Sequence, residues 1–455
     1  MSCKKMISTA LIVGILGMNI SPVICHAKEN KKVIKSQVTE YRFDYINLDW
    51  WKNYEDEYLT GYIIKAIEEN QDLKIATLKV EEANQKVKVQ LSKEFPVAYG
   101  GIAPAVNKMP GITSTDGSIA FPLLVNYEAD IFLKNRDKTK SAKKSYEASK
   151  LDEKSLYITI ASQVGAAYFN IVKLDKLIQI QEEITSSRKE IYELMKKRNN
   201  QGITSTADMV RAEKAYVMAK SDLFDLQKSR TIMLNQLAVL TGESPENTKE
   251  FKRITFDELV FKGNIPNEIN SEIITKRPDY LKAEKMVEKA GIDVRIAKKE
   301  FLPSINIMGL LLFNSSSLSS AFNWSNALAS IGGGAILPLF TGGARIANLK
   351  LSKNKYEQVL QSYYKTNLTA IQEVNDSLSS FKLDNEKYKN NIKTLDMEKA
   401  DYRYSELKYN QGIISNLDLI QRKENLLTME KLVATNKANC YIDQIGLYKA
   451  VGGAL

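Results

Sequence analysis

The 455-residue sequence contains a single histidine, His26, and only three cysteines, Cys3, Cys25 and Cys440. All of these except Cys440 lie in the first 26 residues, within a predicted export signal. The mature chain would therefore hold neither an internal disulfide, nor a His/Cys zinc site, nor a Ser-His or Cys-His catalytic pair. Gly-rich phosphate loops, D-x-D-x-D-G calcium loops and G-x-S-x-G motifs are also missing. We expect no enzymatic activity, no metal site and no cofactor.

The predicted export signal has three parts. Lys4 and Lys5 precede an apolar run over residues 6–18, and the stretch ends in Cys25-His26-Ala27. A basic flank, a short apolar core and small residues before the cut are typical of a secretory signal, so residues 1–27 are predicted to be removed after Ala27. Lipidation of Cys25, as in a bacterial lipoprotein, is the alternative, although Pro22-Val23-Ile24 lacks the usual leucine and small residues.

Long apolar runs are absent from the rest of the chain. No stretch of 18 or more apolar residues follows Ala27, so no transmembrane helix is predicted and only strands could span a membrane. The net charge of +10 is modest, and acidic and basic residues alternate closely, as in Lys79-Val80-Glu81-Glu82. No basic block stands out, so we expect no nucleic-acid partner.

The sequence repeats itself. Residues 72–96 align with 279–303 at a constant shift, and Asn200-Gln201-Gly202-Ile203 recurs as Asn410-Gln411-Gly412-Ile413. Two matching blocks at nearly the same separation indicate an internal duplication. The predicted organisation is an N-terminal extended segment 28–56, repeat 1 over 57–240, a turn-rich linker over 241–269 and repeat 2 over 270–450.

Each repeat has the same predicted order of elements. A first amphipathic helix, at 57–93 or 272–300, ends before a proline, Pro96 or Pro303. Two strand-like segments follow within 97–132 and within 304–340. At about ten residues each, they match a tilted membrane-spanning strand, although a soluble hairpin is an alternative. Long helices are then predicted at 134–199 and 343–409, with return helices at 204–240 and 414–449.

The long helical segments have a narrow apolar stripe. Ile160, Val164, Ala167 and Ile171 alternate steps of four and three, and no proline interrupts either segment. This period is typical of coiled coils. Some 65 residues give a rod of roughly 100 Å. A narrow stripe suits either a solid coiled coil or a hollow wall of helices with water on both sides.

The duplicated Asn-Gln-Gly-Ile motif is predicted to turn each long helix back. Gly202 and Gly412 can adopt the left-handed conformation that ends a helix. Ser205 or Thr206, and Ser415 or Asn416, can cap the return helices. Asp208 and Asp418 then fall in the first turn, where a carboxylate meets the positive end of the helix.

Six passages follow one another in a characteristic order and spacing. They are Trp50-Trp51, residues 66–73, residues 127–132 running into Lys134-Asn135-Arg136, Lys276-Arg277-Pro278-Asp279, Phe301-Leu302-Pro303-Ser304 and residues 338–343. Together they resemble the TolC-like outer-membrane efflux proteins, most closely the OprM-like branch, and the likeness covers nearly all of the mature chain. The resemblance implies an α+β membrane protein in which three subunits form a 12-stranded β-barrel, four strands per subunit. A long periplasmic α-helical barrel with an internal two-fold repeat would continue it.

The resemblance also implies a periplasmic gate. By position, Asp418 matches an aspartate of the pore ring, and Tyr409 and Asp208 match residues that latch the closed tip. Gln421 stands where some members carry a second ring aspartate, and Ile414 where some carry a latching arginine. Helix capping is an alternative role for the two aspartates. The tip turns at Gly202, Ile203, Gly412 and Ile413 would dock an adaptor.

These features predict a passive exit duct in the outer membrane with a long periplasmic extension. The expected partners are two further copies of the chain, a periplasmic adaptor protein, an inner-membrane efflux transporter and outer-membrane lipid. The expected cargo is small toxic molecules such as drugs. A duct for type I protein secretion is the alternative within the same architecture. A soluble periplasmic coiled-coil scaffold or adaptor is the alternative from a different class.

Overall fold

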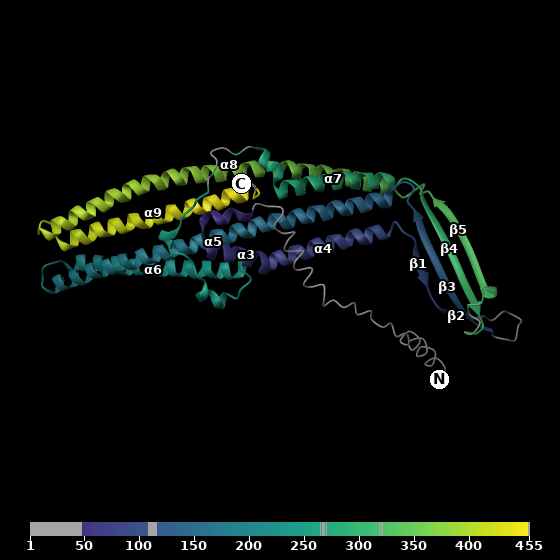
Figure 1. Ribbon diagram of the computed structural model, residues 1–455, viewed down its shortest axis with the longest axis horizontal. Helices are drawn as coiled ribbons and strands as arrows, with labels where there is room; N and C mark the ends of the chain where they lie inside the picture. The colour runs from purple at the N-terminus through teal and green to yellow at the C-terminus, as the bar shows by residue number, and fades with distance from the viewer. Residues whose placement is uncertain are drawn as a thin grey trace, which may run out of the picture. The chain divides into compact units, whose positions relative to one another are not determined.

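The computed structural model describes residues 48–107, 116–263, 265, 269, 271–317, 319 and 322–453. The predicted signal 1–27, including Cys25, and most of the segment 28–56 lie outside the described residues. Contacts divide the chain into Met1–Leu48 and Asp49–Leu455. The second unit, whose helices and strands are drawn in Figure 1, is described here.

The first helical region is divided more finely than its pattern predicts. The 3-10 helix η1 (Leu48–Tyr54) replaces the end of the predicted extended segment, and it buries Trp50 and Trp51. Two helices, α3 (Glu57–Glu69) and α4 (Gln71–Ser92), stand where one is predicted over 57–93. Asn70 separates them, because its extended backbone ends α3 while its side chain accepts hydrogen bonds from the first turn of α4.

The strands form one antiparallel sheet that joins the two repeats. Strands β1 (Val97–Gly100) and β2 (Ala103–Asn107) both pair with β3 (Asp116–Ala129), so they act as one strand interrupted at Gly101-Ile102. Strand β3 pairs with β4 (Ser304–Ser315), and β4 pairs with β5 (Ala327–Ile336). The described sheet therefore has four strand positions, two from each repeat.

Two strands end earlier than predicted. Strand β3 stops at Ala129 because the Asp130 carboxylate accepts the backbone N–H groups of Asn135 and Arg136 and thereby starts the next helix. Strand β5 stops at Ile336 rather than near 340. Pro338, two residues on, has no N–H to give to a ladder.

The long helices have matching lengths in the two repeats. Helices α5 (Lys134–Asn200) and α8 (Ala344–Asn410) each have 67 residues, and α6 (Thr206–Leu240) and α9 (Asn416–Ala450) each have 35. Helix α7 (Pro278–Lys299) precedes β4. Short 3-10 helices complete the connections: η2 (Pro245–Glu250), η3 (Phe256–Glu258), η4 (Ser271–Lys276) and η6 (Trp324–Asn326).

The apolar core surrounds the middle of α5. This helix packs against α3, α4, α6, α7 and α9, and Tyr168 and Phe169 on it are fully buried. Gly165 permits this close packing, because a Cβ there would lie 2.8 Å from Cδ1 of Ile445 and 3.2 Å from the Trp50 ring. Helix α5 is also long and apolar enough to cross a membrane by composition, but 67% of its most apolar stretch is buried within the chain. A core helix meets the same criterion.

Candidate functional site at the hairpin tips

The two tip turns have the same backbone geometry. Gly202 and Gly412 have φ values of +72° and +73°. The backbone N–H of Ile203 donates to Arg198 O, and that of Ile413 donates to Lys408 O, both at 2.8 Å. A left-handed glycine with this hydrogen bond closes a helix in the Schellman manner. The duplicated sequence motif therefore produces a duplicated turn, visible at the tips of the α5–α6 and α8–α9 hairpins in Figure 1.

Serine caps follow both turns. The Ser205 Oγ accepts the N–H of Asp208 at 3.1 Å, and the Ser415 Oγ accepts the N–H of Asp418 at 3.2 Å. Each serine hydroxyl in turn lies 2.7 Å from the aspartate Oδ2 and donates to it. Asp208 and Asp418 thus both sit in capping positions.

The partners of the two aspartate carboxylates differ. Asp208 pairs with Arg211 at 3.1 Å. The Asp418 carboxylate instead accepts a second bond from the Ser415 backbone N–H at 3.2 Å. Hydrogen bonds from Ser415 lower the pKa of Asp418, which is exposed. Asp418 therefore remains a solvent-facing negative charge at neutral pH.

The remaining predicted gate residues lie on α8 and α9. Tyr409, at the end of α8, is 39% exposed. Gln421 is exposed and donates to Asn425 on the same helix at 3.4 Å. Within the part of one subunit that the structure describes, no hydrogen bond joins Tyr409 to Asp208. The turns also expose apolar side chains, with Ile203 64% and Ile413 65% accessible.

A small apolar cluster holds the two hairpins together near the tips. Ile191 and Met195 of α5 are buried against Ile420 of α9. One helical turn further on, Arg188 Nη2 lies 2.8 Å from Glu424 Oε2. Glu424 is only 3% exposed, and this burial raises its pKa although Arg188 opposes the shift. This pair was not predicted from the sequence. Its signal was a charge within the apolar stripe Leu417, Ile420, Leu427.

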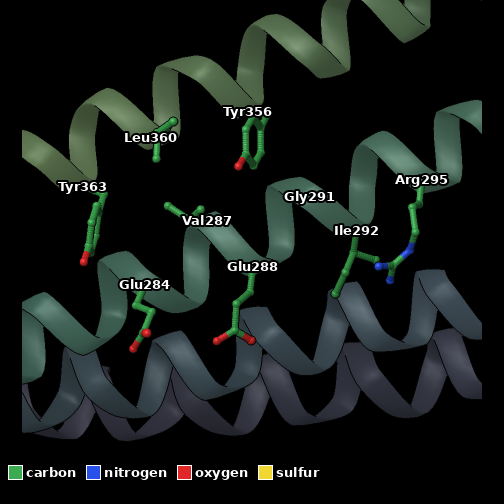
Figure 2. Close-up of a pocket in the computed structure, with 9 residues that line it drawn as sticks. All are labelled: Glu284, Val287, Glu288, Gly291, Ile292, Arg295, Tyr356, Leu360 and Tyr363. Atoms are coloured by element: carbon green, nitrogen blue, oxygen red, sulfur yellow. The ribbon is translucent and has the colours of Figure 1, made fainter.

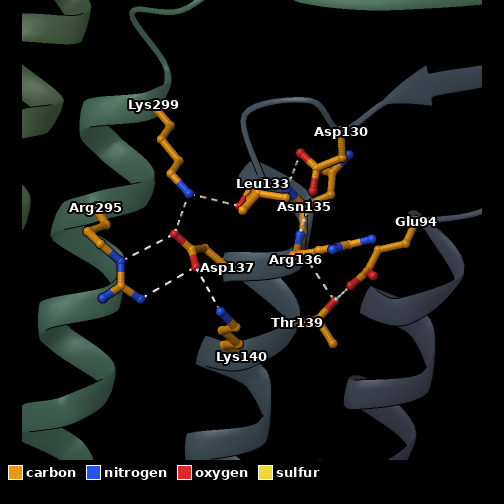
Figure 3. A network of polar contacts seen from close by, with 10 residues as sticks. All are labelled: Glu94, Asp130, Leu133, Asn135, Arg136, Asp137, Thr139, Lys140, Arg295 and Lys299. Atoms are coloured by element: carbon orange, nitrogen blue, oxygen red, sulfur yellow. Dashed lines mark hydrogen bonds and ion pairs between the residues drawn. The ribbon is translucent and has the colours of Figure 1, made fainter.

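A second polar cluster, also missed, lies where the helices meet the sheet. Asp137, in the first turn of α5, is 3% exposed and receives Lys299 at 2.7 Å and Arg295 at 3.3 Å, both from α7 (Figure 3). Thr139 donates to Glu94, which follows α4. These contacts tie three helices together at the base of the strands, and the nearby cations lower the pKa of Asp137 against the opposing effect of its burial.

An open groove lies between α7 and α8. It encloses about 530 Å³, and Val287, Ile292 and Leu360 form its apolar part (Figure 2). Two of its polar lining residues have partners: Glu288 pairs with Lys144 at 2.7 Å, and the Tyr363 and Tyr280 hydroxyls are 2.6 Å apart. No cluster of metal-ligating side chains occurs among the described residues. The groove has the character of a packing surface.

Taken together, the fold defines a duplicated helix-hairpin protein with strands of membrane-spanning length. The sequence pattern of the outer membrane efflux protein family matches residues 62–243 and 270–453, one match for each repeat. The chain belongs to the outer membrane efflux protein family. Its outer-membrane location, its role as a transport duct rather than an enzyme, and its internal repeat follow from this membership, which also rejects a soluble scaffold.

Curated relatives cover most of the chain. The probable efflux pump outer membrane protein TtgC of Pseudomonas putida is 25% identical over 412 residues, which is 89% of this chain and 84% of that protein. The cation efflux system protein CusC of Escherichia coli is 25% identical over 90% of both chains. The toxin and drug export protein A of Aggregatibacter actinomycetemcomitans is 25% identical over 96% of this chain and 98% of its own length.

Solved structures have the same fold. The CmeC outer membrane channel of Campylobacter jejuni superposes with a TM-score of 0.82 at 24% identity, covering 90% of this chain and 89% of that one. The open state of the MtrE channel of Neisseria gonorrhoeae gives 0.79 at 24% identity, covering 90% and 93%.

Proposed function

We propose that the chain is one of three identical subunits of a passive exit duct, serving a tripartite efflux pump for small molecules. The observation that carries this proposal is the sheet of four strand positions. Its outer strands, β1 and β5, have no further partner among the described residues. Open edges are costly in a membrane, and closure with neighbouring copies removes them. Three copies would give a barrel of 12 strand positions.

The exposed face of α8 supports assembly with a second copy. Leu368, Leu383, Met397 and Tyr404 are between 64% and 70% exposed. Their spacings of 15, 14 and 7 residues bring them to one side of the helix. These side chains are separated from one another along α8, and a neighbouring helix in a closed ring would cover each of them. We call these four residues the α8 stripe.

At the periplasmic end, the proposed gate comprises Asp418, Asp208, Tyr409 and Gln421. Asp418 supplies an exposed carboxylate to a ring of three, and Tyr409 and Asp208 act as latches. Capping and gating are compatible, because the cap of Asp418 uses Oδ2 and its own backbone N–H. The adaptor is proposed to dock at Gly202, Ile203, Gly412 and Ile413, where the turns expose isoleucines, and to splay the hairpins.

The cargo is proposed by analogy with the relatives. The relatives include proteins named for a toluene efflux pump, an antibiotic efflux pump and a cation efflux system. The second candidate is a duct for type I protein secretion, favoured by the nearly full-length match to a toxin and drug export protein. Lipidation of Cys25 stays an alternative to cleavage after Ala27, and one relative is named a probable outer membrane lipoprotein.

Fractionation and a transport assay test the proposal. The full chain is expected in the outer-membrane fraction as a trimer that resists detergent and dissociates on heating. Deleting it should sensitise cells to small toxic compounds while leaving secreted proteins unchanged. A carbonate-soluble monomer would overturn the duct, whereas loss of a secreted protein alone would favour the second candidate.

A further inference from the structure

All four junctions between helices and strands lie at the same end of the sheet. Helices α4 and α7 lead into β1 and β4, and β3 and β5 lead out into α5 and α8. The antiparallel register pairs Ala129 with Ile305 and Ser304 with Ile336, which brings these junctions together (Figure 1). Four stretches that are far apart in the sequence therefore form one level of the molecule.

This level is strongly basic. Residues 86–94, 128–144, 295–300 and 345–355 contain 16 lysines and arginines but only five aspartates and glutamates. This excess of 11 exceeds the net charge of the whole chain, +10. Two of the lysines, Lys86 and Lys144, also pair with Glu82 and Glu288, which lie just outside these segments. No basic block appears in the linear sequence because the charge comes from four separate segments. We call these four segments the basic collar.

Internal ion pairs leave much of this charge unbalanced. Asp137 alone is shared by Lys299, Arg295 and Lys140 (Figure 3). Within the described part of the chain, no carboxylate lies within ion-pair distance of Arg136, Lys143, Lys350 or Lys353. Burial and the repulsion of Lys134 lower the pKa of Lys138. The collar therefore holds cations that crowd one another.

Helix stability explains only part of the collar. Lys298 and Lys299 lie in the last turn of α7, where a cation favours the helix. Lys134, Arg136 and Arg345 instead lie in the first turns of α5 and α8, where a cation is unfavourable. Helix α8 has no acidic residue in its first turn. These residues are placed against the preference of the helices that carry them.

Exposed apolar side chains flank the collar on the strand side. Ile131 is 62% exposed, Leu339 89% and Phe340 90%, and all three lie between a strand and the next helix. Apolar and aromatic residues followed by lysines and arginines are typical of the boundary between a bilayer and water. Long cationic side chains there reach the phosphates of the headgroups.

We propose that the basic collar binds the anionic headgroups of phospholipids in the periplasmic leaflet of the outer membrane. The proposal rests on the proposed function, because it requires the strands to span that membrane. Bound lipid supplies the counter-charge that the chain lacks. It also fixes the depth at which the strands sit, since the collar cannot enter the hydrocarbon without losing these contacts.

The test counts lipids bound to the full-length trimer. Protein reconstituted with equal amounts of phosphatidylglycerol and phosphatidylcholine is released into the gas phase, and retained lipids are counted by native mass spectrometry. The wild type should favour phosphatidylglycerol by about threefold or more, and less so at high salt. The combined variant Arg136→Gln, Lys143→Gln and Lys350→Gln should lose at least half of that preference.

A matched variant controls for net charge. Lys189→Gln, Lys214→Gln and Lys387→Gln remove three exposed lysines from other parts of α5, α6 and α8, and the lipid preference should not change. Lipid binding by the collar would be rejected if the collar variant kept the wild-type preference for phosphatidylglycerol. It would also be rejected if the control variant lost as much of that preference as the collar variant. Channel conductance is recorded on the same samples. If the wild type conducts ions but shows no lipid preference, only lipid binding by the collar is rejected. If the protein does not insert into the membrane, both the proposed duct and lipid binding by the collar are rejected.

Discussion

Helices α5 and α8 have the same length and end in the same turn, yet they differ in burial. Twenty-five residues of α5 are buried, but only Ala370, Val374 and Ser405 of α8. Helix α5 is the core of the subunit, whereas α8 contacts chiefly α7 and α9 and leaves an apolar stripe uncovered. Duplication preserved the local geometry, while the two copies took different positions in the subunit. The α8–α9 hairpin, whose long helix has fewer contacts with the rest of the chain, is the one better suited to move.

The largest expected effect is the loss of a core side chain from α5. Phe169→Ala should lower the free energy of unfolding by about 3–5 kcal/mol, because the ring is fully buried against Tyr441 and Tyr54. Thermal unfolding of the detergent-solubilised protein measures the change. Val260→Ala, at an exposed position, should alter the stability by less than about 0.5 kcal/mol. Equal losses at both positions would contradict the core assigned to α5.

The α8 stripe should contribute more to the stability of the trimer than to the folding of the single chain. Leu383→Ser with Met397→Ser should weaken the trimer by about 2 kcal/mol for each side chain covered by a neighbour. Dissociation of the trimer on heating is the measurement, with helix content followed by circular dichroism. Unchanged dissociation would show that the stripe is not a subunit contact. Loss of helix content before dissociation would mean that it belongs to the fold of the monomer.

The equal turns predict equal caps. Ser205→Ala and Ser415→Ala should each cost about 1 kcal/mol, because each removes the acceptor for one backbone N–H and one partner of an aspartate. Thermal unfolding of the two single variants compares them directly. If Ser415→Ala lowers the stability several times more than Ser205→Ala does, the second turn makes further stabilising contacts, such as those of the gate. Threonine at either position retains the hydroxyl and serves as the control.

The smallest expected effect is a pH dependence at the α8–α9 contact. Burial, and then the neighbouring Asp384, raise the pKa of Asp443 to about 6 from an ordinary 3.8. Because the folded pKa is above the unfolded one, the folded state binds the proton more tightly. Its stabilising contribution is complete below about pH 4 and is lost as the pH rises through 6. Asp443 is partly accessible, so solvent screening reduces the effect.

Asp443→Asn should flatten this dependence. Apparent melting temperatures at pH 4.5 and 7.5 measure it, with the wild type gaining stability at the lower pH relative to the variant. Identical pH profiles for wild type and variant would exclude Asp443 as the titrating group.

Local features of the sequence were enough to predict the duplicated hairpins. Gly202 and Gly412 terminate helices by their own conformational freedom, and Ser205 and Ser415 cap by contacts within three residues. The break at Asn70 was missed because its neighbours continue a helical pattern, although an asparagine cap is itself a local signal. The basic collar and the Arg188–Glu424 pair could not be predicted in the same way. They depend on segments more than a hundred residues apart being brought side by side.

The difference between the two hairpins should affect function at the proposed gate. If the α8–α9 hairpin closes the duct, a change at its tip should open it. The decisive measurement is ion conductance of the trimer in planar bilayers for the wild type, Asp418→Ala and Tyr409→Phe. We expect a small conductance for the wild type and a severalfold larger one for each variant. Unchanged conductance in both variants would contradict the gate assignment, and a wild type without channel events would contradict the duct itself.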